Sequence, residues 1–138
     1  MTAQPIMDRP PVRLTLAALW TSTMFCYVYG DYFGLYVPGT VSAMDRGLMR
    51  PLGHATPTLL VTVALMMAAP ALMISLCLLL PRPGCRWANI GFGLFYTLIM
   101  AATLDGSPPF YLALALIEMG LTLSVALVAA RWPKSGMP

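Results

Sequence analysis

The chain has 138 residues, of which 59% are hydrophobic and only 9% are charged, whereas about a quarter of the residues in a soluble domain are charged. This composition predicts one integral membrane domain over residues 1–138 and leaves no room for a separate soluble catalytic module. The net charge is +3, but eight basic residues spread along the chain do not form the basic stripe that nucleic-acid binding requires.

Four apolar stretches follow one another along the chain, each close to the roughly 20 residues that cross a hydrocarbon core about 30 Å thick. They cover residues 14–37, 58–80, 87–104 and 109–130. Breaks rich in proline and glycine separate them, and the two short breaks favour antiparallel neighbours. We therefore expect an all-α fold, a four-helix transmembrane bundle with antiparallel neighbouring helices.

The connection 38–57 is the long one, and it is also the most polar, with Asp45, Arg46, Arg50 and His54. We expect a short helix at the membrane interface within it. Val41-Ser42-Ala43 has the small-residue spacing of a signal-peptide cleavage site. The preceding apolar stretch is too long for a signal peptide and contains Asp31, so we expect it to remain in the mature protein.

The basic residues predict the orientation of the bundle. Six of them fall on one side of the four stretches, namely Arg9, Arg13, Arg82, Arg86, Arg131 and Lys134, and only Arg46 and Arg50 fall on the other. Because Lys and Arg are enriched in cytoplasmic loops, we expect a multi-pass protein of the inner (cytoplasmic) membrane with both termini in the cytoplasm. Aromatic residues at both ends of the stretches agree with interfacial belts, with Trp87 and Trp132 inside and Tyr32, Tyr36, Phe110 and Tyr111 outside.

Two ionisable residues lie within the apolar stretches, where they are costly and usually face the bundle interior. Glu118 is nine residues into the fourth stretch, roughly 14 Å along a helix axis and near mid-membrane. Asp31 lies close to the outer end of the first stretch.

Helical spacing places further polar residues on the same helix faces as Glu118 and Asp31. Tyr111, Glu118 and Thr122 share one face of the fourth stretch, and Tyr27 shares a face with Asp31. The third stretch has a similar stripe of Asn89, Gly93, Tyr96, Met100 and Thr103, and the second has Thr58, Thr62 and then Ala69 beside a kink expected at Pro70. We expect each of these faces to point to the bundle interior. The candidates for ligand or ion binding are Glu118, Asp31, Tyr27, Tyr111, Asn89 and Tyr96. The alternative for the Tyr, Thr and Asn positions is helix packing alone.

No motif assigns catalytic, cofactor-binding or metal-binding residues, and no cofactor is expected. Cys26, Cys77 and Cys85 form no Cys-x-x-Cys pair and are predicted to be free thiols, and one histidine excludes a bis-histidine haem within one chain. His54 with the outer aspartates has no ligand spacing that favours a metal. There is no glycine-rich phosphate loop, so nucleotide is not an expected partner.

Three segments together resemble a known family. They are Leu19-Trp20 with Tyr27-Val28-Tyr29-Gly30-Asp31, then Arg86-Trp87-Ala88-Asn89-Ile90, then Pro109-Phe110-Tyr111-Leu112 with Ile117-Glu118. This chain resembles the DUF6326 family of small bacterial four-helix membrane proteins of unknown function, which is loosely DoxX-like. The resemblance implies a four-helix membrane bundle and no particular activity. It also implies an acidic residue two positions before Pro70, where this chain has Ala68.

Three functions stay open. The first is a non-enzymatic bundle that binds a lipid or apolar ligand, or that supports a larger membrane complex. The second is a small proton- or cation-linked transporter that uses Glu118, and the third is a quinone-linked redox membrane protein. The expected partners are the lipid bilayer and either further copies of the chain or a larger membrane complex. We expect any site to open outward, between the first and fourth stretches.

Overall fold

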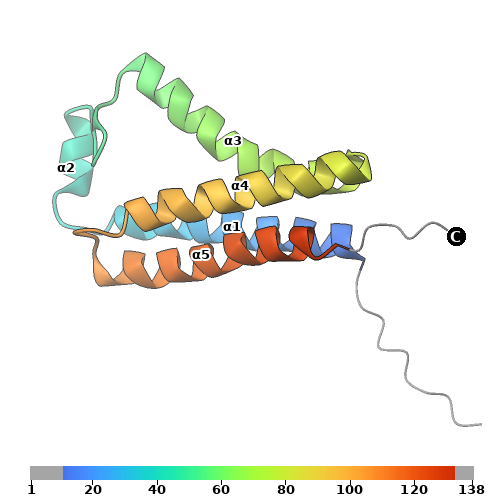
Figure 1. Ribbon diagram of the computed structural model, residues 1–138. Helices are drawn as coiled ribbons and strands as arrows, with labels where there is room; N and C mark the ends of the chain where they lie inside the picture. The colour runs from blue at the N-terminus through green and yellow to red at the C-terminus, as the bar shows by residue number, and fades with distance from the viewer. Residues whose placement is uncertain (1–10, 133–138) are drawn as a thin grey trace, which may run out of the picture.

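The computed structural model describes residues 11–132 and contains four long helices. They are α1 (Val12–Gly34), α3 (Pro57–Leu79), α4 (Arg82–Ala102) and α5 (Pro109–Ala130). Helices α1, α4 and α5 run side by side, and α3 joins them along its second half (Figure 1). The short helix α2 (Thr40–Asp45) and the strands β1 (Leu48–Met49) and β2 (Gly53–His54) stand between α1 and α3. The prediction of a mainly helical fold with four long helices is confirmed.

Prolines start three of the long helices. Pro57, Pro83 and Pro109 lie in the first turns of α3, α4 and α5, where a missing backbone N–H costs nothing. At α3 the side chain of Thr56 also accepts a hydrogen bond from the N–H of Leu59, at 3.2 Å. Helix α4 begins at Arg82, five residues before the predicted start at residue 87, and it therefore includes Pro83 in its first turn.

The connection between α1 and α3 contains the short helix that was predicted there, α2, and a hairpin that was not. In the hairpin Leu48 pairs with His54 and Met49 with Gly53 in an antiparallel ladder, and the Arg50–Pro51 peptide bond is cis. The glycine at position 53 has a φ of 94°, a conformation that other residues rarely adopt. The all-α prediction therefore misses one two-residue ladder.

Helices α4 and α5 form the closest pair of the fold. A Cβ atom built on Gly93 would lie 2.8 Å from the carbonyl oxygen of Thr122 and 3.1 Å from the Cβ of Ala126. On the next turn the hydroxyl groups of Thr97 and Thr122 lie 2.7 Å apart and form a hydrogen bond. Four members of the stripe predicted here face this contact and the core, since Asn89, Gly93, Tyr96 and Met100 are buried, whereas the fifth, Thr103, follows the helix and is exposed.

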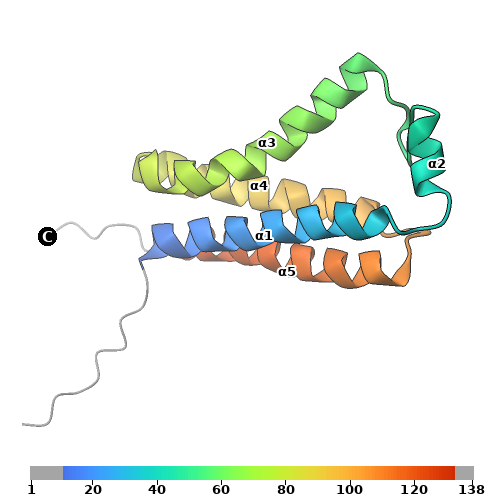
Figure 2. The ribbon, with the colours of Figure 1, turned by 180° about the vertical axis from the view of Figure 1, so that it is seen from behind.

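Helix α3 changes direction along its length, and its first half leans away from α1 and α4 (Figures 1 and 2). Its buried residues, Pro70, Met73 and Cys77, all lie in the second half. Pro70 lacks the N–H that would bond to the carbonyl of Met66, which is the usual cause of a kink. Thr58 and Thr62 were predicted to face the interior, but both are exposed because they lie on the diverging half.

Arginines gather at the end where α1 starts, α3 meets α4, and α5 ends. One guanidinium nitrogen of Arg13 donates to the carbonyl oxygens of Cys77, Leu78 and Leu80 at 2.7–3.1 Å. Arg86 donates to the carbonyl of Ala130 at the end of α5, at 2.9 Å. Both side chains therefore satisfy backbone groups that a helix C-terminus leaves unpaired. The predicted basic positions Arg9 and Lys134 lie outside the described residues.

Candidate functional site

A cavity of about 150 Å³ lies where α1, α3, α4 and α5 meet, in the half of the bundle away from the arginine end. It is lined by Tyr27, Gly30, Asp31, Met66, Met67, Tyr96, Ile99, Met100, Thr103, Tyr111 and Glu118. Five of the six residues selected from the sequence are in this lining. The space lies between α1 and α5, as expected from the sequence, but α3 and α4 complete its walls.

Glu118 and Tyr27 are the buried polar residues of the cavity that lack partners. Glu118 is only 3% exposed, and its Oε2 atom has no hydrogen-bond partner among the described residues. The hydroxyl oxygen of Tyr27, on α1, is likewise buried and unpaired. A buried polar group without a partner costs about 1–3 kcal/mol, and more if it is charged. The two groups are therefore suited to a bound molecule that supplies the missing hydrogen bonds.

The hydroxyl groups of the other two tyrosines are already used. Tyr96 donates to the backbone carbonyl of Met66, the group that Pro70 leaves without a helical partner. Tyr111 donates to the hydroxyl oxygen of Thr103, at 3.2 Å. These bonds fix both rings, so that Tyr96 and Tyr111 contribute aromatic surface to the cavity and no free hydroxyl hydrogen.

Asp31 lines the cavity one helical turn after Tyr27, but unlike Glu118 it is exposed. It therefore marks the accessible side of the cavity. The residues that line the cavity include two carboxylic acids and no Arg, Lys or His, which makes its electrostatic character acidic.

Asn89 is the one candidate that lies outside the cavity. Its Oδ1 accepts a hydrogen bond from the indole N–H of Trp20 at 2.8 Å, and its Nδ2 donates to the carbonyl of Cys85 at 2.7 Å. The thiol of Cys77 also donates to Oδ1, at 3.4 Å. Because these residues are fully buried and their partners are all within the bundle, Asn89 connects α1, α3 and α4 structurally.

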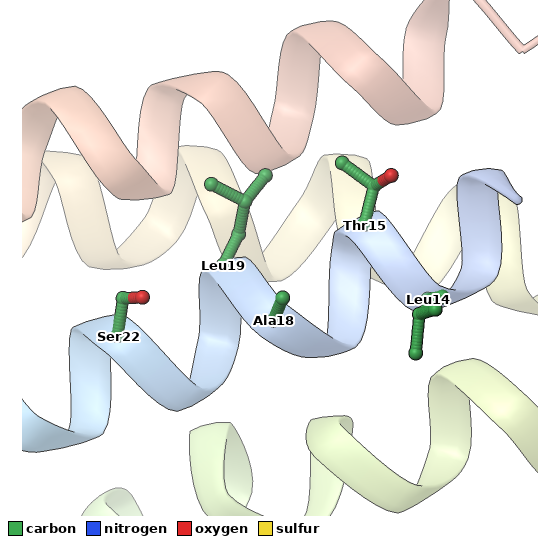
Figure 3. A pocket seen from close by; sticks show the side chains of 5 residues that line it. All are labelled: Leu14, Thr15, Ala18, Leu19 and Ser22. Carbon is green, nitrogen blue, oxygen red and sulfur yellow. The ribbon is translucent and has the colours of Figure 1, made fainter. Parts of the chain in front are cut away.

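A larger depression of about 350 Å³ lies at the start of α1. All five residues that line it come from this one helix, as Figure 3 shows: Leu14, Thr15, Ala18, Leu19 and Ser22. The hydroxyl of Thr15 is directed to the carbonyl of Pro11 in its own chain segment, at 3.4 Å. A hollow along one helix has no opposing wall to enclose a ligand, so we do not regard it as a site.

The thiols and the histidine are dispersed. Cys26 is half-buried, whereas Cys77 and Cys85 are buried, and all three are free. His54 is exposed in β2. Within residues 11–132 there is no group of three or more His, Cys, Asp or Glu side chains arranged to hold a metal ion.

Sequence reasoning missed the contribution of α3 to the site. Met66 and Met67 form part of the cavity wall, at the point where α3 bends. Met66 precedes Pro70 by four residues, so its unpaired carbonyl was predictable from the sequence. Its tyrosine partner was not, because Tyr96 is 30 positions away.

Comparison with known proteins gives a family and no function. No curated protein and no solved structure matches the chain. A family model described as a family of unknown function (DUF6326) matches residues 9–137, nearly the whole chain. The chain belongs to the DUF6326 family.

Proposed function

We propose that the chain is a multi-pass membrane protein in which all four long helices cross the bilayer, and that it is a non-enzymatic bundle that binds a small ligand beside Glu118. Two helices, α3 and α5, are long and apolar enough to cross a membrane. The most apolar window of α3 is only 11% buried, whereas a comparable core helix of a soluble protein would be mostly buried. This exposure supports lipid as the medium around the bundle.

The lengths and surfaces of the other helices support the same proposal. All four have 21–23 residues, which corresponds to about 31–35 Å of helix and matches the thickness of a hydrocarbon core. The outer surfaces of α1 and α4 carry exposed large apolar side chains, among them Phe25, Val28, Phe92, Leu94, Phe95 and Leu98. Exposed apolar surface of this extent is typical of contact with lipid.

The orientation in this proposal follows from the arginine end, which would face the cytoplasm of the inner membrane. Reporter fusions test it. An alkaline phosphatase joined at Gly106, between α4 and α5, should be active because it lies outside, whereas a fluorescent protein joined after Lys134 should fold inside. A phosphatase that is inactive at Gly106, or a fluorescent protein that does not fold after Lys134, would contradict a four-span bundle in this orientation.

One observation carries the ligand-binding part of the proposal: Glu118 Oε2 and Tyr27 Oη are buried, unpaired and adjacent to one cavity. Leaving such groups in a bundle is costly unless they are paired. The mostly apolar wall of Met66, Met67, Ile99 and Met100 suits a small molecule that also has apolar surface.

Filling the cavity tests this function. Gly30 is buried and lines the cavity, whereas Gly34, one turn later on α1, has no atom within 4 Å of an added Cβ. We expect Gly30→Leu to lose the small molecules that native mass spectrometry detects on the wild-type protein in nanodiscs, and Gly34→Leu to retain them. A wild-type protein that retains no molecule, and that no small compound stabilises against heat, would contradict the proposal.

A second candidate, proton- or cation-linked transport, is favoured by the shape of α3. The first half of this helix contributes no buried residue, so it has few contacts to break if the cavity is to open and close at the end of the bundle away from the arginines. Proteoliposomes with a trapped pH dye and imposed gradients of sodium or potassium test it. Proton movement that Glu118→Gln abolishes would support transport, and movement unaffected by this variant would exclude Glu118 as its carrier.

A further inference from the structure

The unpaired groups in the cavity both accept hydrogen bonds, and this restricts what can fill it. Among the tyrosines that line the cavity, Tyr96 and Tyr111 have committed their hydroxyl hydrogens to other partners. Glu118 Oε2 and Tyr27 Oη have none. A carboxylate only accepts hydrogen bonds, and a phenol oxygen accepts as well as donates. A molecule with at least two N–H or O–H donors on one atom would satisfy both residues.

The charges around the cavity favour a cation over a neutral molecule. Glu118 is buried and Asp31 lines the same space, and no basic side chain is among the lining residues. Arg13 and Arg86 are at the opposite end of the bundle and are bound to helix carbonyls. A positive charge next to a buried carboxylate removes the cost of leaving that carboxylate unpaired. An anion would meet the carboxylates without any compensating charge.

The walls favour an organic cation over a metal ion. The rings of Tyr27, Tyr96 and Tyr111 border the space together with three methionines, and aromatic faces attract ammonium groups by cation–π interactions. Hard metal cations instead take about six or more oxygen ligands, whereas this lining has two carboxylates, and the hydroxyl hydrogens of Tyr96, Tyr111 and Thr103 are already donated to other partners. The volume of about 150 Å³ corresponds to about five water-sized groups, at about 30 Å³ each.

We propose that the occupant of the cavity is a small primary ammonium ion, which donates hydrogen bonds to Glu118 Oε2 and Tyr27 Oη while its short alkyl chain contacts Met66, Met67 and Met100. This proposal rests on the ligand-binding function proposed above and identifies the class of its ligand. The ammonium group has three N–H donors, enough for both acceptors. The same chemistry is offered by a free alkylamine and by the ethanolamine headgroup of a phospholipid.

Binding of n-butylammonium, with five non-hydrogen atoms, tests the proposal against its neutral counterpart, 1-butanol. The wild-type protein is placed in nanodiscs of phosphatidylcholine and phosphatidylglycerol, which contain no primary amine, and titrated by calorimetry against empty nanodiscs. We expect n-butylammonium to bind more tightly than both 1-butanol and tetramethylammonium, because the alcohol has no charge and the quaternary ion has no N–H group. Equal affinity for n-butylammonium and 1-butanol would overturn the ammonium proposal.

Variants separate the two contacts. Glu118→Gln keeps the size of the side chain and should weaken n-butylammonium binding by about 30-fold or more while leaving 1-butanol unchanged. Tyr27→Phe should mainly remove the preference for the primary over the quaternary ammonium ion. Because Asp31 is exposed, Asp31→Asn offers a folded variant with reduced negative charge even if Glu118→Gln does not fold, and it should weaken the two cations but not 1-butanol. Unchanged cation affinity in every variant that folds would overturn the proposal.

The source of the ammonium group is resolved with a second lipid mixture. If phosphatidylethanolamine replaces phosphatidylcholine and weakens the binding of n-butylammonium, the lipid headgroup competes for the site; unchanged binding identifies free amines as the ligand. Either result supports an ammonium site. If the neutral alcohol binds as well as the amine and Gly30→Leu abolishes both, the ammonium class is wrong and the ligand-binding function stands. If neither compound binds and Gly30→Leu alters nothing that the protein retains, the proposed function fails as well.

Discussion

The hydroxyl group of Tyr96 on α4 donates a hydrogen bond to the backbone carbonyl of Met66 on α3. Pro70, four residues after Met66, has no N–H to give to that carbonyl. In the proposed membrane location no water would be present to replace the lost partner, so a neighbouring helix has to supply one. Tyr96 thus stabilises the bend of α3 and at the same time forms part of the cavity wall.

Removing this hydroxyl should destabilise the bundle. We expect Tyr96→Phe to lower the free energy of unfolding by about 1–3 kcal/mol, because the carbonyl of Met66 is then left unpaired. Unfolding in mixed micelles, titrated with a denaturing detergent, measures the change. Tyr29→Phe is the matched control, since Tyr29 is exposed and should tolerate the loss of its hydroxyl.

A double-mutant cycle with Pro70→Ala isolates the mechanism. Alanine restores the N–H that bonds to Met66, so Tyr96→Phe should cost less in the Pro70→Ala protein than in the wild type. Equal costs in the two backgrounds would show that the contribution of Tyr96 comes from ring packing and not from this hydrogen bond.

The contact between α4 and α5 depends on the absence of a side chain at Gly93. A methyl group there would lie 2.8 Å from a backbone oxygen and 3.0 Å from a backbone nitrogen, neither of which can move without shifting α5. We expect Gly93→Ala to destabilise the protein by about 1–3 kcal/mol. Gly91→Ala, two residues earlier and with open space around the added methyl, should leave the unfolding midpoint unchanged or raise it. The reverse ranking would show that α4 and α5 are not packed as described.

Arg13 and Arg131 lie at the same end of the bundle but differ in their contacts. Arg13 donates to three carbonyls at the end of α3, whereas the side chain of Arg131 is exposed. In the proposed membrane orientation, each contributes one positive charge to the cytoplasmic side. We expect Arg13→Gln to cost about 1 kcal/mol and to speed amide hydrogen exchange at the end of α3, and Arg131→Gln to change neither. Equal effects would mean that both arginines act only through their charge.

Much of this fold was predictable because its signals are local. The apolar stretch 109–130 coincides with α5, because Pro109 marks the start of the helix. Glu118 is the one charged residue inside this stretch. The spacing of Tyr27 with Asp31 and of Tyr111 with Glu118 was enough to select residues that line one cavity. Periodicity identifies which side chains share a face. The ionisable residue Glu118 marks the buried face of α5, whereas Asp31, nearer a helix end, is exposed.

The remaining features depend on contacts between distant residues. Pro70 predicts a kink in α3 but not the direction in which the first half turns, so Thr58 and Thr62 were placed in the interior and are exposed. Pro83 was interpreted as part of a loop, because the sequence alone does not distinguish a proline that breaks a helix from one in its first turn. The strands β1 and β2 have two residues each, too few to give a strand pattern.

Asn89 was selected from the sequence as a candidate for ligand binding, but the structure places it outside the cavity. Its amide connects the indole of Trp20, the thiol of Cys77 and the backbone of Cys85, all of them away from the cavity. Replacing it with leucine, which is similar in size, leaves the buried N–H of Trp20 unpaired. We expect Asn89→Leu to lower the free energy of unfolding by about 1–3 kcal/mol and to leave ligand affinity in the folded protein unchanged.

Glu118→Gln should show the opposite pattern, with affinity lost and stability kept or increased, because the amide removes a buried charge. Loss of affinity in Asn89→Leu at temperatures where the protein remains folded would place Asn89 within the binding site and contradict the separation of the two clusters.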